Sequence, residues 1–332
     1  MTTNYSAQYF INGILQSDVA ILSRTITLVE STNQINQNLA QEIINGIIFK
    51  TGNSFRIGVT GVPGVGKSTF IESFGKEVIA NGHKLAVLAI DPSSNKSKGS
   101  ILGDKTRMEE LSNNPNVYIR PSPSSGNLGG VTRVTYETIL LCEAAGFDFI
   151  IVETVGVGQS EIAVSKVTDF FLLLMLAGAG DELQGIKRGI MEMADALIIS
   201  KADGDNLNKA KAAKLEYAHA MHHFQKSQSG WIPRADICSS ISNLGIKSVY
   251  KMIMEYRQFV LSTDYFLVNR KQQQFELFSS SMEDHLKNYF YSSIFIQKKI
   301  KEFHLLNNTD SIQPFLLAKN IVDEFFKNNE IE

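Results

Sequence analysis

Apolar and polar positions follow two kinds of spacing along this chain, and they predict a repeated change between strand and helix. Between residues 51 and 240, short and nearly continuous apolar runs recur, as in strands buried on both faces of a parallel sheet. The runs lie at 55–60, 84–91, 117–120, 147–152, 170–177 and 196–199, and residues 234–240 look like a last strand and loop. Helical spacing fills several gaps between them, at 68–74, 131–145 and 206–226. We therefore expect an α/β fold with a mostly parallel sheet flanked by helices.

Helical spacing also predicts an extension at each end of the sheet domain. Residues 18–50 carry apolar side chains at helical spacing, whereas residues 1–17 show little pattern. After the sheet, further helices are expected at 245–262, 265–289, 291–304 and 311–328. The predicted division is a helical extension over 1–50, a sheet domain over 51–262 and a helical region over 263–332. Aromatic residues in the last region fit either a dimer or partner surface or a core of its own.

Composition changes this picture little. The chain has 332 residues, 43% of them hydrophobic, which suffices for one large domain with extensions or for two smaller domains. A net charge of −2 favours neither nucleic acid nor an anionic membrane surface. Cys142 and Cys238 form no metal-binding or CxxC pattern, so a reducing cytoplasm is the expected location. The sequence predicts no signal peptide and no membrane span.

The strongest chemical signal follows the first predicted strand. Gly61 to Ser68, Gly-Val-Pro-Gly-Val-Gly-Lys-Ser, fits the phosphate-binding pattern G-x-x-x-x-G-K-[ST], with a strand before it and a helix after it. Its glycines let backbone N–H groups close around an anion, here from Gly64, Val65 and Gly66. Lys67 would reach the β- and γ-phosphates, and the Ser68 hydroxyl would bind Mg²⁺.

Acidic residues end two other predicted strands. Ligands in such sheets bind at the carboxyl ends of strands, so Asp91 and Glu153 are candidates for the metal and for an attacking water. Glu153 is longer than the usual Asp, which favours a contact with the metal through water. Asp104 could join the same shell, and the Gly156 N–H could sense the γ-phosphate. The alternatives are a turn-capping Asp91, a helix-capping Asp104 and an exposed strand-end Glu153.

A base-binding pattern follows the run at 196–199. Ser200-Lys201-Ala202-Asp203 resembles the N/T-K-x-D sequence of guanine-specific P-loop proteins. The Asp203 carboxylate would accept two N–H bonds from guanine, and the Lys201 stem would stack on the base. Ser239 and Ser240 follow the last predicted strand, where a backbone N–H could reach guanine O6. Plain helix capping is the alternative role for Asp203.

Several strings together resemble one family. They include Gly-Val-Thr-Gly-Val-Pro-Gly-Val-Gly-Lys-Ser-Thr (58–69), Ala-Ile-Asp-Pro-Ser-Ser (89–94), Glu-Thr-Val-Gly-Val-Gly-Gln-Ser-Glu (153–161) and Gly-Asp-Glu-Leu-Gln-Gly-Ile-Lys-Arg-Gly-Ile (180–190). The chain is similar to the methylmalonyl-CoA mutase-associated GTPases of the MeaB/ArgK type, in the SIMIBI class of P-loop proteins. The resemblance covers about residues 18–262. It implies a homodimeric chaperone that uses GTP to gate cobalamin loading and protection of a B12-dependent acyl-CoA mutase, with an adenosyltransferase as a possible further partner.

The resemblance also assigns roles by position. It gives phosphate and Mg²⁺ to Lys67, Ser68 and Thr69, the metal and water shell to Asp91, Asp104 and Glu153, and guanine to Lys201 and Asp203. Residues 93–107, 154–161 and 178–190 correspond to three switches. No Arg finger is evident, so slow turnover is expected until a partner binds, with Lys187 and Arg188 as candidates to supply charge. Ser200 for the usual Asn and Ser240 for the usual Ala depart from the pattern.

Three other functions compete with this one. An ATP-using kinase linked to amino-acid transport is an older label for ArgK-type proteins, and Asp203 argues against it. A nickel-chaperone GTPase would need a Cys/His tract, which the sequence lacks. A non-catalytic scaffold would bind nucleotide only to stabilise a dimer, and it would show no GTP turnover.

Overall fold

The predicted strand segments form the seven strands of one sheet, in the order β3-β2-β4-β1-β5-β6-β7. The computed structural model describes residues 5–91, 108–123, 128–154, 160–178, 188–221, 227–305 and 313–329. Its strands are β1 Phe55–Gly61, β2 Leu85–Asp91, β3 Val117–Pro123, β4 Phe149–Thr154, β5 Phe170–Met175, β6 Ala196–Ile199 and β7 Arg234–Ile237. Each strand pairs in parallel with its neighbours, which confirms the predicted fold class.

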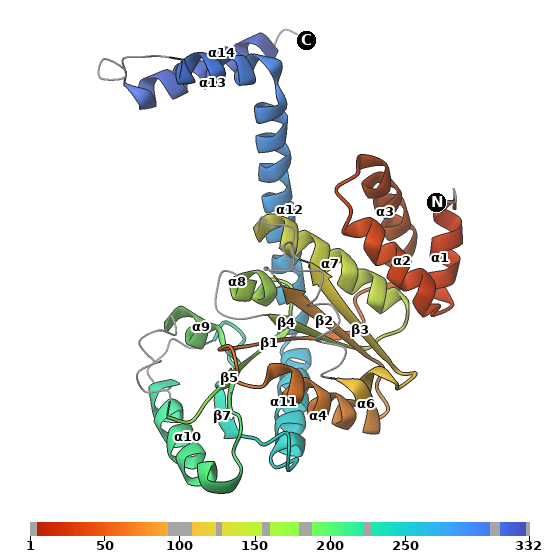
Figure 1. The fold of residues 1–332 in the computed structure, drawn as a ribbon, viewed down its shortest axis with the longest axis vertical. Coiled ribbons are helices and arrows are strands. Elements are labelled where there is room, and N and C mark those ends of the chain that lie inside the picture. The colour runs from red at the N-terminus through yellow and green to blue at the C-terminus, as the bar shows by residue number, and fades with distance from the viewer. Residues whose placement is uncertain are drawn as a thin grey trace. The chain divides into compact units, whose positions relative to one another are not determined.

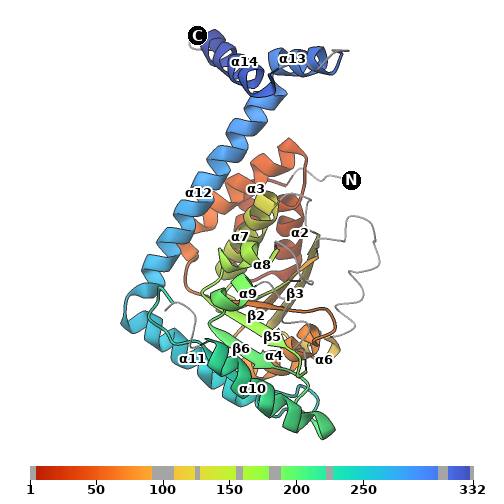
Figure 2. The ribbon, with the colours of Figure 1, turned by 90° about the vertical axis from the view of Figure 1, so that its left-hand side faces the viewer.

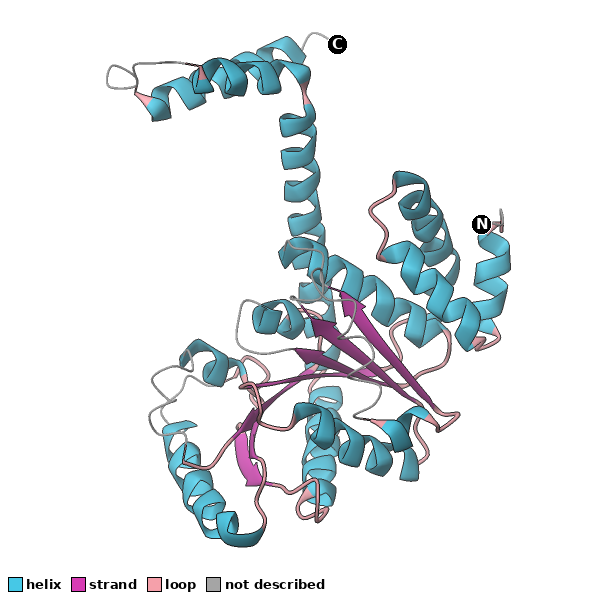
Figure 3. Ribbon diagram, viewed as in Figure 1, coloured by secondary structure: helices cyan, strands magenta, loops and turns pink. Residues whose placement is uncertain are grey.

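Helices cover both faces of this sheet (Figures 1 and 3). Apolar residues of α4 (Lys67–Ala80) and α11 (Ile246–Ser262) share one core with the side chains of β1 that point to that face. On the other face, α8 (Ser160–Ser165) packs so closely that a Cβ on Gly58 would lie 2.9 Å from Val164 Cγ1. The remaining helices of the sheet domain are α6 (Glu109–Ser112), α7 (Leu128–Ala144), α9 (Arg188–Met193) and α10 (Leu207–Met221).

The N-terminal extension is a group of three helices beside α7 and the β3 edge (Figure 2). They are α1 (Ala7–Leu15), α2 (Val19–Val29) and α3 (Gln34–Ile47). Side chains of Asp18 and Asn33 cap α2 and α3 by accepting backbone N–H groups. The weak pattern of residues 1–17 concealed α1, which buries Phe10 and Ile14. Polar contacts to β3 fasten α2, including an ion pair between Arg120 and Glu30.

The strand order decides where a ligand can bind. β1 lies at the centre, between β4 and β5, and all seven strands point the same way. The carboxyl ends of β1, β2, β4, β6 and β7 therefore lie at one edge of the sheet. An open parallel sheet binds ligands at this edge, where the strand order reverses. The phosphate loop after β1 thus lies between the candidate metal residues and the candidate base residues.

Helix α12 (Tyr265–Ser292) begins at the opposite edge of the sheet and is anchored there by buried charges. Arg270 makes two hydrogen bonds to the Asp169 carboxylate, at 2.6 and 2.7 Å, and one to the Ser54 carbonyl at 2.8 Å. Gln273 donates to the Thr168 carbonyl at 2.6 Å. These partners lie just before β1 and β5, so the first turns of α12 belong to the sheet domain.

The described chain divides into two compact units, residues 1–273 and 274–332. The second unit holds the rest of α12 with α13 (Ile294–His304) and α14 (Pro314–Asn329). Ile296 and Phe325 are buried there, and the Phe290 and Phe325 rings meet edge to face at 4.9 Å. The three-part division predicted from the sequence stays a prediction. Over the residues the structure describes, no helix has the length and apolarity needed to cross a membrane.

Candidate active site

The loop after β1 has the backbone shape of an anion cradle. Gly61, Gly64 and Gly66 have φ angles of 152°, 78° and 94°, a region that favours glycine. A Cβ on Gly61 would lie 2.5 Å from the Leu174 carbonyl oxygen, so a side chain has no room there. The loop ends at Lys67, where α4 begins and its first-turn N–H groups have no helical partner. Gly64, Val65 and Gly66 thus stand where the sequence predicted phosphate contacts.

Lys67 closes this loop from inside. Its Nζ donates to the carbonyl oxygens of Gly61 at 2.7 Å and Val62 at 3.3 Å. Burial lowers the pKa of Lys67, while the nearby carboxylates of Glu153 and Glu161 oppose that shift. A buried ammonium that donates to neutral carbonyls gains from an anionic partner, so phosphate oxygens suit this position.

Ser68 and Glu153, two of the predicted metal ligands, lie in contact. The Ser68 hydroxyl donates to Glu153 Oε1 at 3.2 Å, and Glu153 is only 4% exposed. In the sheet, Glu153 lies opposite Val59 of β1 and Ala89 of β2. A hydroxyl and a carboxylate are oxygen ligands of the kind Mg²⁺ prefers, so the residues present fit this ion. Thr69, in contrast, is exposed in the first turn of α4.

The structure places the other predicted phosphate and metal residues only in part. Asp91 is the last residue of β2, two positions beyond the residue that pairs with Glu153, and its side chain is not described. Asp104, Gly156 and Lys187 lie outside the described residues. Two of the four predicted metal ligands are therefore seen together, and the backbone of a third ends the neighbouring strand.

The base side begins directly after β6. Lys201 has a φ angle of 54°, and Asn206 holds it by donating to the Lys201 carbonyl at 2.7 Å. The Lys201 Cε lies 4.0 Å from the position of a Cβ on Gly66, so its stem runs beside the phosphate loop. The structure therefore brings Lys201 next to the loop that the sequence predicts to hold phosphate.

Asp203 is held by the loop after β7. The Ser239 hydroxyl donates to Asp203 Oδ2, and the Ser242 N–H donates to Ser239 Oγ at 3.2 Å. The Ser240 carbonyl accepts a 2.9 Å hydrogen bond from Ser73 of α4. Both predicted base-loop serines thus form hydrogen bonds: Ser239 bonds to Asp203 through its side chain, and Ser240 bonds to α4 through its carbonyl. Ser239 is fully buried.

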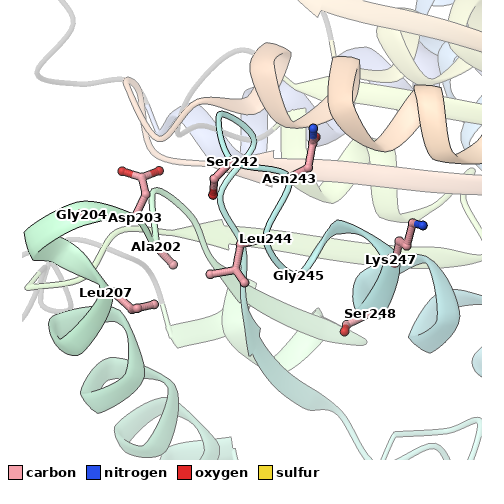
Figure 4. Close-up of a pocket in the computed structure, with 10 residues that line it drawn as sticks. All are labelled: Ala202, Asp203, Gly204, Leu207, Ser242, Asn243, Leu244, Gly245, Lys247 and Ser248. Atoms are coloured by element: carbon pink, nitrogen blue, oxygen red, sulfur yellow. The ribbon is translucent and has the colours of Figure 1, made fainter.

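A pocket of about 630 Å³ opens beside Asp203. Figure 4 shows Asp203 and the base-loop residues Ser242 to Gly245 on opposite sides of it. Gly245 has a φ angle of 76°, and a Cβ there would lie 2.2 Å from the Ile237 carbonyl oxygen. Only glycine lets the loop turn into α11 at this point, and this turn shapes the wall of the pocket.

Two residues of the site were not among the site residues predicted from the sequence. Glu161, in the first turn of α8, is 1% exposed and close enough to Lys67 to affect its pKa. The sequence signal for Glu161 was its position in the family-like string at 153–161, which begins with the acid at the end of β4. Ser200 appeared in the sequence only as a departure that raised the question of loop anchoring. In the structure its hydroxyl donates to the Val65 carbonyl at 2.7 Å, so it contacts the phosphate loop directly.

A glycine loop between β1 and α4, an acid at the end of β4 and a base loop beside β6 define a P-loop nucleotide hydrolase. Comparison with known proteins refines this class. The chain matches the family described as methylmalonyl-CoA mutase-associated GTPase MeaB over residues 22–294. It belongs to that family and is a P-loop GTPase of the SIMIBI type, as the sequence predicted.

Individual relatives are consistent with this family assignment. GTPase ArgK of Escherichia coli is 41% identical, with 92% of each chain covered. The mouse methylmalonic aciduria type A homolog, a mitochondrial protein, is 44% identical over 83% of this chain and 70% of its own. A crystal structure of a protein named LAO/AO transport system kinase has a TM-score of 0.78 and 33% identity, covering 98% of this chain and 99% of that one.

Proposed function

We propose that this GTPase is a guanine-nucleotide switch that gates cobalamin loading and protection of a B12-dependent acyl-CoA mutase. The family match over residues 22–294 carries the proposal, because that family is described by its association with methylmalonyl-CoA mutase. The mouse relative, whose name refers to methylmalonic aciduria, supports the same link. A cytoplasmic location and contact with an adenosyltransferase belong to the same proposal.

In the proposed reaction, water attacks the γ-phosphate and GDP leaves, with catalysis by positioning and charge neutralisation. Lys67 exchanges its two loop carbonyls for β- and γ-phosphate oxygens. Ser68, Asp91, Asp104 and Glu153 would hold Mg²⁺, which neutralises charge on those phosphates when bound. Glu153 already touches the Ser68 hydroxyl, so these two ligands need little rearrangement.

Guanine selectivity rests on Asp203 and its support. The Ser239 hydroxyl orients the Asp203 carboxylate, and the Lys201 stem lies beside the phosphate loop. A guanine edge presents two N–H donors to a carboxylate, whereas adenine lacks that pair and would leave the acid without partners. GTP and GDP are therefore the proposed ligands.

Turnover should be slow until a partner binds. Lys187 is the proposed source of additional charge at the γ-phosphate, and the Gly156 N–H is the proposed sensor of that phosphate. The family's association with a mutase supports a partner that acts through these two residues.

A homodimer is proposed through the second unit. Its part of α12 exposes Phe275, Phe278, Met282, Leu286 and Tyr289. These positions are three or four residues apart, so they form one stripe along the helix. Few apolar residues of the second unit are buried among its described residues, so this stripe has little to pack against within the unit. A second copy of the chain could cover it.

The decisive experiment is a pull-down from the native host with the chain loaded with a non-hydrolysable GTP analogue. We expect a B12-dependent acyl-CoA mutase to co-purify. The purified mutase should raise GTP turnover by more than about ten-fold, which is less than the acceleration that an added cationic side chain can provide in such sites. Lys67→Ala is the control that should neither bind GTP nor respond. If the purified mutase neither binds the loaded chain nor changes its turnover, the proposed function is wrong.

The similarity to a protein named as a transport-system kinase calls for a second arm in this experiment. The chain is incubated with γ-labelled ATP or GTP together with host extract, and labelled protein is compared with released phosphate. Phosphate released from GTP but not from ATP, without labelled protein, supports the switch. Labelled protein formed from ATP would support the kinase.

A further inference from the structure

Two buried threonines face each other where β1 and β4 approach their carboxyl ends. The Thr154 hydroxyl donates to the Thr60 hydroxyl at 2.9 Å, and the two residues are 0% and 2% exposed. In the described part of the chain, backbone pairing between these strands runs as far as Val59 and Glu153. The threonines are the next residues of each strand, so their hydrogen bond continues the contact one step beyond that pairing.

Each threonine remains paired with the strand on its other side. Thr60 lies opposite Leu173 of β5, and Thr154 lies opposite Ile90 of β2. The outer neighbours therefore hold both strand ends in place through the backbone. Between the two ends, a bond from side chain to side chain takes the place of the backbone bonds. The distance between the ends of β1 and β4 thus depends on this hydroxyl pair.

The threonine pair lies directly behind the candidate metal ligands. Thr154 follows Glu153, whose carboxylate accepts from the Ser68 hydroxyl, and Thr60 is the last residue before the phosphate loop. Successive side chains of a strand point to opposite faces, so the threonines lie on the face of the sheet that Glu153 does not share. Because β4 carries Glu153 and β1 leads through the loop to Ser68, the separation of the strand ends affects the distance between the two ligands.

We propose that this threonine pair positions the metal ligands, and that its hydrogen bond holds Glu153 within reach of a Mg²⁺ ion shared with Ser68. The threonines act through the strand ends and do not contact the ion. Loss of one hydroxyl leaves the other buried without this partner, and the strand ends then shift to satisfy it. The inference rests on the proposed Mg²⁺ site.

The test measures binding of a fluorescent, non-hydrolysable GTP analogue in Mg²⁺ and in EDTA, for the parent chain, Thr154→Val and Thr154→Ser. Valine has nearly the shape of threonine without its hydroxyl, whereas serine keeps the hydroxyl. Thr154→Val should weaken binding about ten-fold in Mg²⁺, as removal of an outer-shell group commonly does. In EDTA it should change binding by less than about two-fold, because the phosphate loop itself is unaltered. Thr154→Ser should bind as the parent does in both conditions.

A double-mutant cycle shows whether the two hydroxyls act as one unit. Thr60→Val should resemble Thr154→Val, and the double valine variant should show the same loss rather than the sum of both. Thr25→Val is the matched control, because Thr25 is another fully buried threonine whose hydroxyl bond is also 2.9 Å long, within α2. Whatever stability this control loses, it should bind the analogue as tightly as the parent in both conditions.

Three results would overturn the inference. They are parent-like binding of Thr154→Val in Mg²⁺, equal losses in Mg²⁺ and in EDTA, and losses of the single valine variants that add in the double variant. If Thr154→Val does not fold, the double variant, which leaves no hydroxyl alone in the core, provides the same comparison.

Failure of the proposed Mg²⁺ site gives a different result. If Mg²⁺ does not tighten binding of the analogue to the parent chain, the placement of the metal is wrong. If Mg²⁺ tightens binding to the parent and to the valine variants alike, the metal site stands and the threonine pair does not position it.

Discussion

Asp203 is the side chain on which selectivity between purine bases most depends. Ser239 already donates to one of its oxygens, so an amide at position 203 would keep that bond and turn N–H groups toward the base. Two donors would then face the guanine N–H groups, whereas xanthine offers a carbonyl instead of the amino group. Asp203→Asn should raise the KM for GTP by at least about 100-fold and permit turnover of XTP.

Steady-state kinetics with GTP and XTP check this prediction. Asp205→Asn is the control, since Asp205 is exposed two residues further on and the charge change is the same. Its KM for GTP should stay within about two-fold, because an exposed charge contributes little. An unchanged GTP preference in Asp203→Asn would show that this carboxylate does not read the base.

At the scale of one element, the start of α12 depends on Arg270. Its side chain is 11% exposed and pairs with Asp169 at 2.6 Å and Glu143 at 3.6 Å, both nearly inaccessible to solvent. Removing Arg270 leaves the buried Asp169 carboxylate without this cation, whereas Glu143 keeps its ion pair with Arg56 at 2.8 Å. Arg270→Ala should therefore lower the free energy of unfolding by about 3–5 kcal/mol. Arg270→Lys should recover only part of this loss, because lysine cannot make the paired contacts.

Urea unfolding of the full chain, followed by circular dichroism, measures these changes. Lys76→Ala is the control from an exposed ion pair, since Lys76 and Glu110 are 46% and 78% exposed. It should cost less than about 1 kcal/mol. If Arg270→Ala is no more costly than Lys76→Ala, the buried charges do not anchor α12.

At the scale of the whole molecule, the second unit should determine the oligomeric state. Phe278 and Leu286 lie on the apolar stripe of α12 and are 58% and 55% exposed. The full chain should have a molar mass of twice 36.8 kDa in light scattering after size exclusion. The double substitution Phe278→Arg and Leu286→Arg should produce monomers, because a buried apolar contact cannot accommodate unpaired charges. Intrinsic GTP turnover should persist, since the candidate site lies within residues 1–273.

Ser280→Arg tests whether charge alone breaks the dimer. Ser280 is exposed two residues after Phe278, about 200° around the helix and off the stripe. It should remain dimeric. If the parent chain is a monomer, the proposed dimer does not exist. If dimers persist in the double arginine variant, the contact between copies lies elsewhere.

Short-range patterns in the sequence predicted most of the strands and helices. Every predicted strand appears within a few residues of its expected position. The strands β1, β4, β5 and β6 are buried along their whole length and must therefore be apolar, whereas β7 at the sheet edge is only partly buried. Local pattern failed at α1, which packs against α2, α3 and α7. Its apolar residues include exposed Tyr9 and Leu15 as well as buried Phe10 and Ile14, so they do not mark out one clear face.

The sequence by itself determined the phosphate loop, the acids at strand ends and the base pattern, because these chemistries need particular residues at fixed local spacing. Only the tertiary structure decided what those residues touch. It placed Ser239 on Asp203, Glu161 near Lys67 and the Ser200 hydroxyl on Val65. Such contacts join segments far apart in the chain, and no local pattern encodes a distance across a sheet.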